Sequence, residues 1–354
     1  MIVTTAFLLT AFVQSDSTLQ DTTRRSRTTV LPVVSYSEVT GIQYGATLFR
    51  GFRVADRTDT RPSSVSLYAA FTAKDHAKAY AQLDRWSADN STRSRARVEY
   101  ISYPLPFFGI GRTTPDSSEE WYSSGVTTVQ FFVDRAWRTS LFLHGGLRFT
   151  RSRLREFEAG GLLDADIVPG AFGSDVIATS AGVVFDSRDD VGAPRTGTYA
   201  RLIPSIAAKV FGGDAAFRRL TIDVRRYKAL GEQVAAFQVQ YDGIAGTAPF
   251  DLMPMIGADT AMRGYPRGRY RDQHAFTTQA ELRSAQWRRF GAVLFAGAGT
   301  VASRFTDLSS GSWFPSVGGG VRYLLSPRYR TIVRADLAVG RGSFGVHLGI
   351  GEAF

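Results

Sequence analysis

Apolar and polar residues alternate with a period of two over much of this chain. In residues 219–227 the even positions are Leu220, Ile222, Val224 and an arginine, and the odd positions are polar, charged or tyrosine. The same alternation returns in residues 331–339 and 343–351. Successive side chains of a β-strand point to opposite faces, so each segment is predicted to be a strand with one apolar and one polar face.

Sixteen segments follow this pattern, which is an even number. They are 33–37, 41–50, 64–73, 78–87, 93–103, 120–133, 137–148, 175–186, 197–210, 215–229, 232–245, 274–287, 290–302, 312–325, 330–340 and 343–354. Most of them reach the roughly 9–11 residues that a tilted strand needs to cross a bilayer. The sequence therefore predicts an all-β fold, a 16-stranded antiparallel transmembrane β-barrel.

The connections between these segments tend to alternate between short and long. Tight turns are expected at Arg135, 230–231 and 288–289, whereas 104–119, 149–174 and 246–273 are long and rich in Gly, Pro and charge. Outer-membrane barrels have short periplasmic turns and long outer loops. The link 51–62 departs from this rule, because a short turn is expected there.

A soluble β-sandwich also has short alternating strands and is the alternative fold. The polar faces here carry many Gly and Ala with lone Arg and Asp, which favours the barrel. In hydrocarbon every backbone polar group must be paired, so the sheet must close and its apolar face must meet lipid. A midplane Arg facing lipid would cost about 2–4 kcal/mol. The residues expected in the lumen are Arg95, Arg97, Glu99, Arg219, Asp223, Arg225, Gln238, Gln240, Arg322, Arg334 and Asp336.

Composition excludes several other functions. The chain has no Cys, which removes disulfides and thiolate metal sites, and its four His are far apart in sequence. Its net charge of +10 comes from scattered Arg and not from one basic run, so no nucleic-acid partner is expected. No nucleophile-elbow motif is present. We expect no enzymatic activity, no metal and no cofactor.

The N-terminal region differs from the rest of the chain. Residues 2–13 are apolar or Thr throughout, so 1–15 is predicted to be a secretory signal peptide. Residues 16–31 are mostly polar and are predicted to be a flexible periplasmic lead-in. The barrel is predicted to span 32–354.

Met262-Arg263-Gly264-Tyr265 lies inside the longest predicted outer loop. It resembles the [V/L]RG[F/Y] signature of the BamA/TamA-type surface-antigen superfamily, an assembly and translocation family of the bacterial outer membrane. The resemblance implies that this loop folds back into the lumen. It also implies that the Arg docks on the inner wall of the twelfth and thirteenth strands, counted along the barrel. A buried Arg needs carboxylate partners. Gly297 in Phe295-Ala296-Gly297-Ala298-Gly299 replaces the Asp of the family's F-x-D-x-G run. Either Glu281 or Asp336 takes the role of that Asp, or the loop is held more weakly.

A second motif runs from Asp186-Ser187-Arg188-Asp189 to Pro194-Arg195-Thr196-Gly197. It resembles the superfamily's D-[ST]-R-D…P-x-x-G stretch at a periplasmic turn. Its carboxylates could suggest calcium, but the spacing lacks the fixed ligands of an EF-hand. We predict a self-capped turn in which Arg188 neutralises neighbouring Asp residues.

The last predicted strand carries a third motif. Phe344, Val346, Leu348, Ile350 and Phe354 share one parity and are predicted to face lipid, with Glu352 on the same face at the water interface. This strand resembles the C-terminal targeting signal that the outer-membrane assembly machinery reads.

The resemblance implies a role in inserting or translocating proteins, or lipids, at the outer membrane. No periplasmic repeat domain is expected to fit before residue 32, and residues 103–111 resemble those of stand-alone family members. Substrate capture is therefore expected to need a partner protein or a weak seam in the barrel. The seam would lie between the short segment 33–37 and the Gly-bearing segment 343–354. Expected partners are outer-membrane lipid, the assembly machinery, an unfolded protein or lipid substrate, and a lipoprotein. A passive pore for anionic solutes and a scaffold for a lipoprotein or surface enzyme stay as alternatives.

Overall fold

A computed structural model describes residues 28–37, 41–55, 60–165, 167–257, 261–326 and 330–354. The predicted signal peptide, 1–15, lies outside the described residues. In the described part of the chain, no helix is long and apolar enough to cross a membrane.

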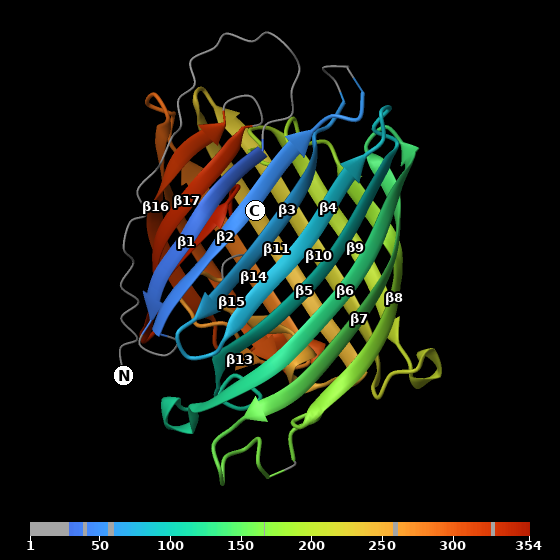
Figure 1. Ribbon diagram of the computed structural model, residues 1–354, viewed down its shortest axis with the longest axis vertical. Coiled ribbons are helices and arrows are strands. Elements are labelled where there is room, and N and C mark those ends of the chain that lie inside the picture. Colours follow the sequence, from blue (N-terminus) through green and yellow to red (C-terminus); the bar gives the residue numbers. More distant parts are fainter. Residues whose placement is uncertain (1–27, 38–40, 56–59, 166, 258–260, 327–329) are drawn as a thin grey trace.

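Sixteen strands form one antiparallel sheet in which neighbours follow each other in chain order. The sheet curls into a barrel (Figure 1), which confirms the predicted fold class. The strands are β1 (Thr28–Ser37), β2 (Gly41–Phe52), β3 (Ser63–Thr72), β4 (Ala77–Trp86), β5 (Thr92–Phe107), β6 (Glu120–Arg138), β7 (Leu141–Glu156), β8 (Gly173–Asp186), β9 (Gly197–Ala207), β10 (Ala216–Leu230), β11 (Gln233–Thr247), β14 (His274–Arg283), β15 (Phe290–Ala302), β16 (Phe314–Ser326), β17 (Thr331–Gly340) and β18 (Ser343–Ile350).

The long connections carry the remaining elements. A two-stranded sheet of β12 (Met255–Ile256) and β13 (Tyr270–Arg271) lies between β11 and β14. Four short 3-10 helices are η1 (Asp116–Ser118), η2 (Lys209–Phe211), η3 (Phe250–Leu252) and η4 (Phe305–Leu308). The connections after β5, β7 and β9 lie at one end of the barrel, the lower end in Figure 1.

Several strand boundaries differ from the sequence prediction, and two of the differences change an element that was expected there. β1 begins at Thr28, so 28–31 belong to the sheet and not to a flexible lead-in. Thr28 pairs with Arg50 and Thr29 with Phe49, because β2 is long enough to supply a partner for each added residue. The turn predicted at Arg135 is also wrong: β6 continues to Arg138, with a register shift after Ala136.

The outer face of the sheet is apolar and the inner face is polar. Leu67, Val98, Val129, Leu202 and Leu294 are exposed on the outside. The predicted lumen charges point inward and are paired there, for example Arg225 Nη2 to Asp223 Oδ2 at 2.6 Å. Lipid-facing apolar rows and an inward polar face are what a closed sheet requires in a membrane.

The seam of the barrel lies between β1 and β18. Within the described residues the ladder of paired strands ends at these two, and no register joins them. β1 has 10 residues, so the expectation of a short first strand is wrong. β18 has 8 residues and is the shortest strand of the barrel.

Candidate functional site: the loop docked in the lumen

The connection between β11 and β14 folds into the barrel and packs on the wall of β14–β16. Its Ile256, Met262, Tyr265 and Tyr270 share a buried cluster with Ala275 of β14, Val301 of β15 and Phe314 of β16. The rings of Tyr270 and Phe314 stack with centroids 3.7 Å apart. Burial of these apolar side chains brings the loop tip onto the inner wall.

Arg263 at the tip of this loop is fully buried. Its Nη1 donates to Asp336 Oδ2 at 2.6 Å, and its Nη2 donates to Glu281 Oε1. The guanidinium also lies over the ring of Phe295, 3.5 Å from the centroid. Each carboxylate offsets part of the cost of removing the guanidinium from water, and hydrogen bonds between charged groups are the strong kind. Both candidate partners therefore contact Arg263.

A glycine-lined wall makes room for the tip. A Cβ on Gly340 would lie 2.5 Å from the Tyr265 ring, and a Cβ on Gly299 would lie 3.2 Å from Met262. A Cβ on Gly297 would come within 2.9 Å of Thr278 O and 3.4 Å of Met262 Sδ. The space above Gly297 is thus occupied by the loop itself, and Asp336, two strands away, supplies the carboxylate that Gly297 lacks.

The backbone of the tip is tied to the last strand. Gly264 has φ +100°, a conformation that favours glycine, and its N–H donates to His347 Nε2 at 3.2 Å. Ser343 Oγ donates to Gly264 O at 2.5 Å. The Tyr265 hydroxyl donates to Pro315 O at 2.7 Å and accepts from Arg341 N–H at 2.8 Å.

Sequence reasoning did not identify Ser343, His347 or Pro315 as contacts of the tip. The parity of β18 held part of the signal, because His347 lies on the face opposite Phe344 and Leu348 and so points into the lumen.

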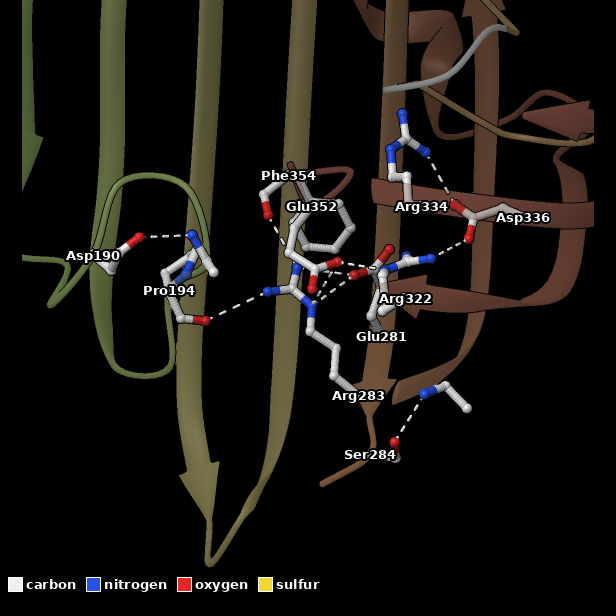
Figure 2. Close-up of polar contacts among 12 residues, drawn as sticks. Asp190, Pro194, Glu281, Arg283, Ser284, Arg322, Arg334, Asp336, Glu352 and Phe354 are labelled. Carbon is white, nitrogen blue, oxygen red and sulfur yellow. Dashed lines mark hydrogen bonds and ion pairs between the residues drawn. The ribbon is translucent and has the colours of Figure 1, made fainter. Parts of the chain in front are cut away.

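The ion pairs around Arg263 extend into a wider buried network (Figure 2). Asp336 also accepts from Arg322 Nη1 at 2.5 Å and from Arg334 Nη1 at 3.0 Å. Glu281 accepts from Arg283 Nη2 at 2.9 Å. Charges that are buried together in this way keep each other neutralised, so removing one leaves others without a partner.

The residues after β18 turn into the lumen, which corrects the sequence prediction. Phe354 is 4% exposed and packs with Tyr227 and Ala236, and its carbonyl oxygen accepts from Arg283 Nη2 at 3.0 Å (Figure 2). Glu352 accepts from Arg322 Nε at 2.7 Å. Phe354 and Glu352 therefore do not face lipid. The chain turns at Gly351, where φ is +86°, because two arginines in the lumen stabilise a carboxylate that hydrocarbon would not.

The other residues of the last strand keep the predicted direction. Phe344, Leu348 and Ile350 are exposed on the outer face, and Val346 shares their parity. Whether this strand acts as a targeting signal stays a prediction.

The second motif forms a self-capped turn at the opposite end of the barrel from the long loops. Arg188 Nε and Nη2 donate to the two carboxylate oxygens of Asp186 at 2.9 and 3.0 Å. Asp189 Oδ1 accepts from the N–H groups of Arg195 and Thr196. At Gly197, φ is +104° and a Cβ would lie 2.3 Å from Ser187 O, so the turn requires glycine. These contacts agree with the predicted geometry.

Two neighbouring contacts fix this turn to the rest of the barrel. Arg61, from the link after β2, donates to Asp186 Oδ2 at 2.8 Å, so the unexpectedly long link packs against the motif. Pro194 O accepts from Arg283 Nη1 at 3.4 Å (Figure 2). Among the residues with described coordinates, no group of three or more His, Asp or Glu could hold a metal ion.

An antiparallel sheet curled into a barrel, with an apolar outer surface and an arginine-tipped loop in its lumen, defines an integral β-barrel of the bacterial outer membrane. The Omp85 superfamily domain matches residues 57–354. The chain belongs to this superfamily.

Solved structures support the fold. BamA from Haemophilus ducreyi, crystallised without POTRA domains 1–3, is similar with a TM-score of 0.59 and 12% identity, over 98% of this chain and 74% of that one. CdiB from Acinetobacter baumannii has a TM-score of 0.55 and 13% identity, over 91% of this chain. This chain covers 59% of the length of CdiB. No curated protein sequence matches the chain.

Proposed function

We propose that this barrel assists the insertion or translocation of proteins, or of lipids, at the outer membrane. The observation that carries the proposal is the seam: β1 and β18 end the ladder without a register between them in the described residues. An unpaired strand edge can accept another strand, which is how a substrate strand would be received.

The docked loop supports an asymmetric seam. Ser343 and His347 hold β18 to the loop tip, whereas β1 has its recorded strand pairing with β2 alone. We therefore propose β1 as the side of the seam that moves. Its partner surface would come from β18, which the loop keeps in place.

Hydrogen exchange across the seam in detergent tests this proposal. Amides of β1 are expected to exchange faster than those of β10 and β11, which are paired over 15 residues. Protection of β1 and β18 equal to that of β10 and β11 would contradict the proposal.

A disulfide lock gives a functional test, because the chain has no native Cys. Val30→Cys is combined in turn with Leu348→Cys and Ile350→Cys, and the locked barrel is assayed in proteoliposomes for assembly of an unfolded outer-membrane protein. Locking should abolish the activity, and a reductant should restore it. The control pair, Val224→Cys with Val239→Cys, joins directly opposed residues of two paired strands and should leave the activity unchanged.

A passive pore for anionic solutes is the second candidate. Its support is a lumen cavity lined by five Arg and two Asp. Conductance in planar bilayers separates the two candidates. If the docked loop plugs the lumen, as the assembly role expects, the intact barrel should conduct little, and deletion of 250–272 should give a large anion-selective conductance. A large conductance from the intact barrel would favour the pore over the assembly role.

A further inference from the structure

A cavity of about 350 Å³ lies in the lumen beside the docked loop. Its walls are side chains of β5–β11 and β14, and Leu252 and Met255 of the loop close one side. Ligand sites in proteins commonly have volumes of roughly 300–1,000 Å³. The cavity is therefore large enough for a small molecule.

The lining of this cavity carries more cations than anions. Asp242 is already bound by Arg219, whose Nε donates to Oδ1 at 2.7 Å. Asp134 Oδ1 lies 2.7 Å from His144 Nδ1. Both lining carboxylates are thus engaged by neighbours. The lining arginines are Arg93, Arg95, Arg148, Arg201 and Arg219.

Two of these arginines have no close carboxylate of their own. Arg148 is exposed to the lumen and, among the described residues, makes no ion pair. Arg201 approaches Asp223 only at 3.7 Å, and Arg225 holds that carboxylate at 2.6 Å. The Nε of Arg201 is buried, and none of the residues that the structure describes is its hydrogen-bond partner. A buried donor is stabilised by an acceptor, so Arg201 is suited to bind an anion that enters the cavity.

Arg148 and Arg201 also repel each other. Arg148 lies within electrostatic range of both Arg201 and Arg219, which are like charges, and of Asp242, whose carboxylate Arg219 already binds. A multiply charged anion between them would offset this repulsion and accept hydrogen bonds from both guanidinium groups. Guanidinium groups match the oxygens of phosphate in pairs, and the hydroxyls of Thr150 and Ser205 line the same space.

We infer that the lumen cavity is a binding site for a phosphate group, held between Arg148 and Arg201. The site does not depend on whether the barrel inserts proteins or conducts ions. The phosphate could belong to a soluble phosphate ester or to a lipid headgroup, and the two sources share the chemistry that these arginines recognise.

Calorimetry on the purified full chain in a non-ionic, phosphate-free detergent tests the inference. The probes are inorganic phosphate, glycerol 3-phosphate and a short-chain phosphatidylglycerol. Binding of the first two identifies a soluble source, and binding of the phospholipid alone identifies a headgroup. Either result supports the site only if Arg148→Gln and Arg201→Gln each weaken binding by about tenfold or more.

Arg226→Gln is the matched control. Arg226 lies on the same strand as Arg219 but on the outer face, where it is exposed and donates to Thr198 Oγ1. This variant loses the same charge and should bind as the wild type does. All variants are first checked for heat-modifiable migration, which reports a folded barrel. No binding of any probe, or equal weakening by all three substitutions, would overturn the inference.

Discussion

The wall formed by β14–β18 is covered by the docked loop, whereas the wall formed by β5–β11 faces an open cavity of about 350 Å³. On the covered wall, Gly297, Gly299 and Gly340 let the loop approach the sheet closely. On the open wall, arginines such as Arg148 and Arg201 extend into the lumen.

The same kind of ion pair has a different environment on each wall. Arg263 and its partners Glu281 and Asp336 have fully buried side chains. The side chains of Arg219 and Asp242 are 24% and 25% exposed. Solvent screens the second pair and not the first, so the location of a contact in the lumen decides how much it stabilises.

The largest effect is expected from Asp336→Asn. This carboxylate accepts from Arg263, Arg322 and Arg334, so its loss leaves three buried cations short of a counter-charge. We expect a loss of about 3–5 kcal/mol in the free energy of unfolding, measured by urea titration in detergent. Asp242→Asn on the open wall should cost about 1 kcal/mol or less. Equal losses would remove the distinction between the walls.

Gly340→Ala should have the next largest effect. The added Cβ would lie 2.5 Å from the Tyr265 ring, so the loop or the strand must shift, at about 1–3 kcal/mol. Limited proteolysis of the loop should become faster. Gly145→Ala places a Cβ in open space on β7 and should change neither quantity. An unchanged rate of loop cleavage in Gly340→Ala would show that close backbone approach is not what holds the loop.

Tyr265→Phe should cost about 1 kcal/mol. It removes the acceptor of Arg341 N–H and the donor to Pro315 O while keeping the ring. Tyr199→Phe, on the open wall, is the comparison and should cost less. Thermal unfolding monitored by gel migration measures both, and a greater loss from Tyr199→Phe would reverse the ranking.

The smallest effect is expected from Asp251→Asn in the docked loop. Burial raises the pKa of Asp251, although Ser152 and Arg271 act against the rise. In the described part of the chain, its Oδ1 has no hydrogen-bond partner. A raised pKa in the docked state means that docking is most stable below the ordinary carboxyl pKa and weakens as pH rises through the raised value. The protection of loop amides against hydrogen exchange, relative to an unstructured peptide at the same pH, should therefore increase on mild acidification. Asp251→Asn should protect the loop at neutral pH and flatten this pH dependence, and an unchanged dependence would exclude Asp251 as its source.

Alternation of side chains was enough to predict the number of strands and the direction of their faces. It placed Asp223, Arg225 and Asp336 in the lumen because a strand allows only two directions. It failed after Ile350, where the turn at Gly351 ends the strand and sends Glu352 toward Arg322. The alternation of side chains does not show where a strand ends. Here the end depends on a charge carried by another strand, Arg322, which binds Glu352.

The sequence was enough to recognise the Arg263 motif, but it did not predict which residues surround the Arg263 side chain. Glu281 and Asp336 could be named as partners, yet nothing local in the sequence indicated that both would contact the same guanidinium. Likewise, the sequence comparison indicated only that Gly297 lacks the carboxylate of the family motif. In the structure, Met262 of the loop packs against Gly297 and fills the space of a side chain there. Such contacts depend on how a loop settles across several strands, which a local pattern does not contain.

Arg263 joins Glu281 of β14 to Asp336 of β17, and the adjoining Gly264 and Tyr265 reach β18 and β16. The loop thus bridges five successive strands, β14–β18, and resists their separation. Any widening of the barrel is therefore expected in the strands that the loop does not bridge, β1–β11.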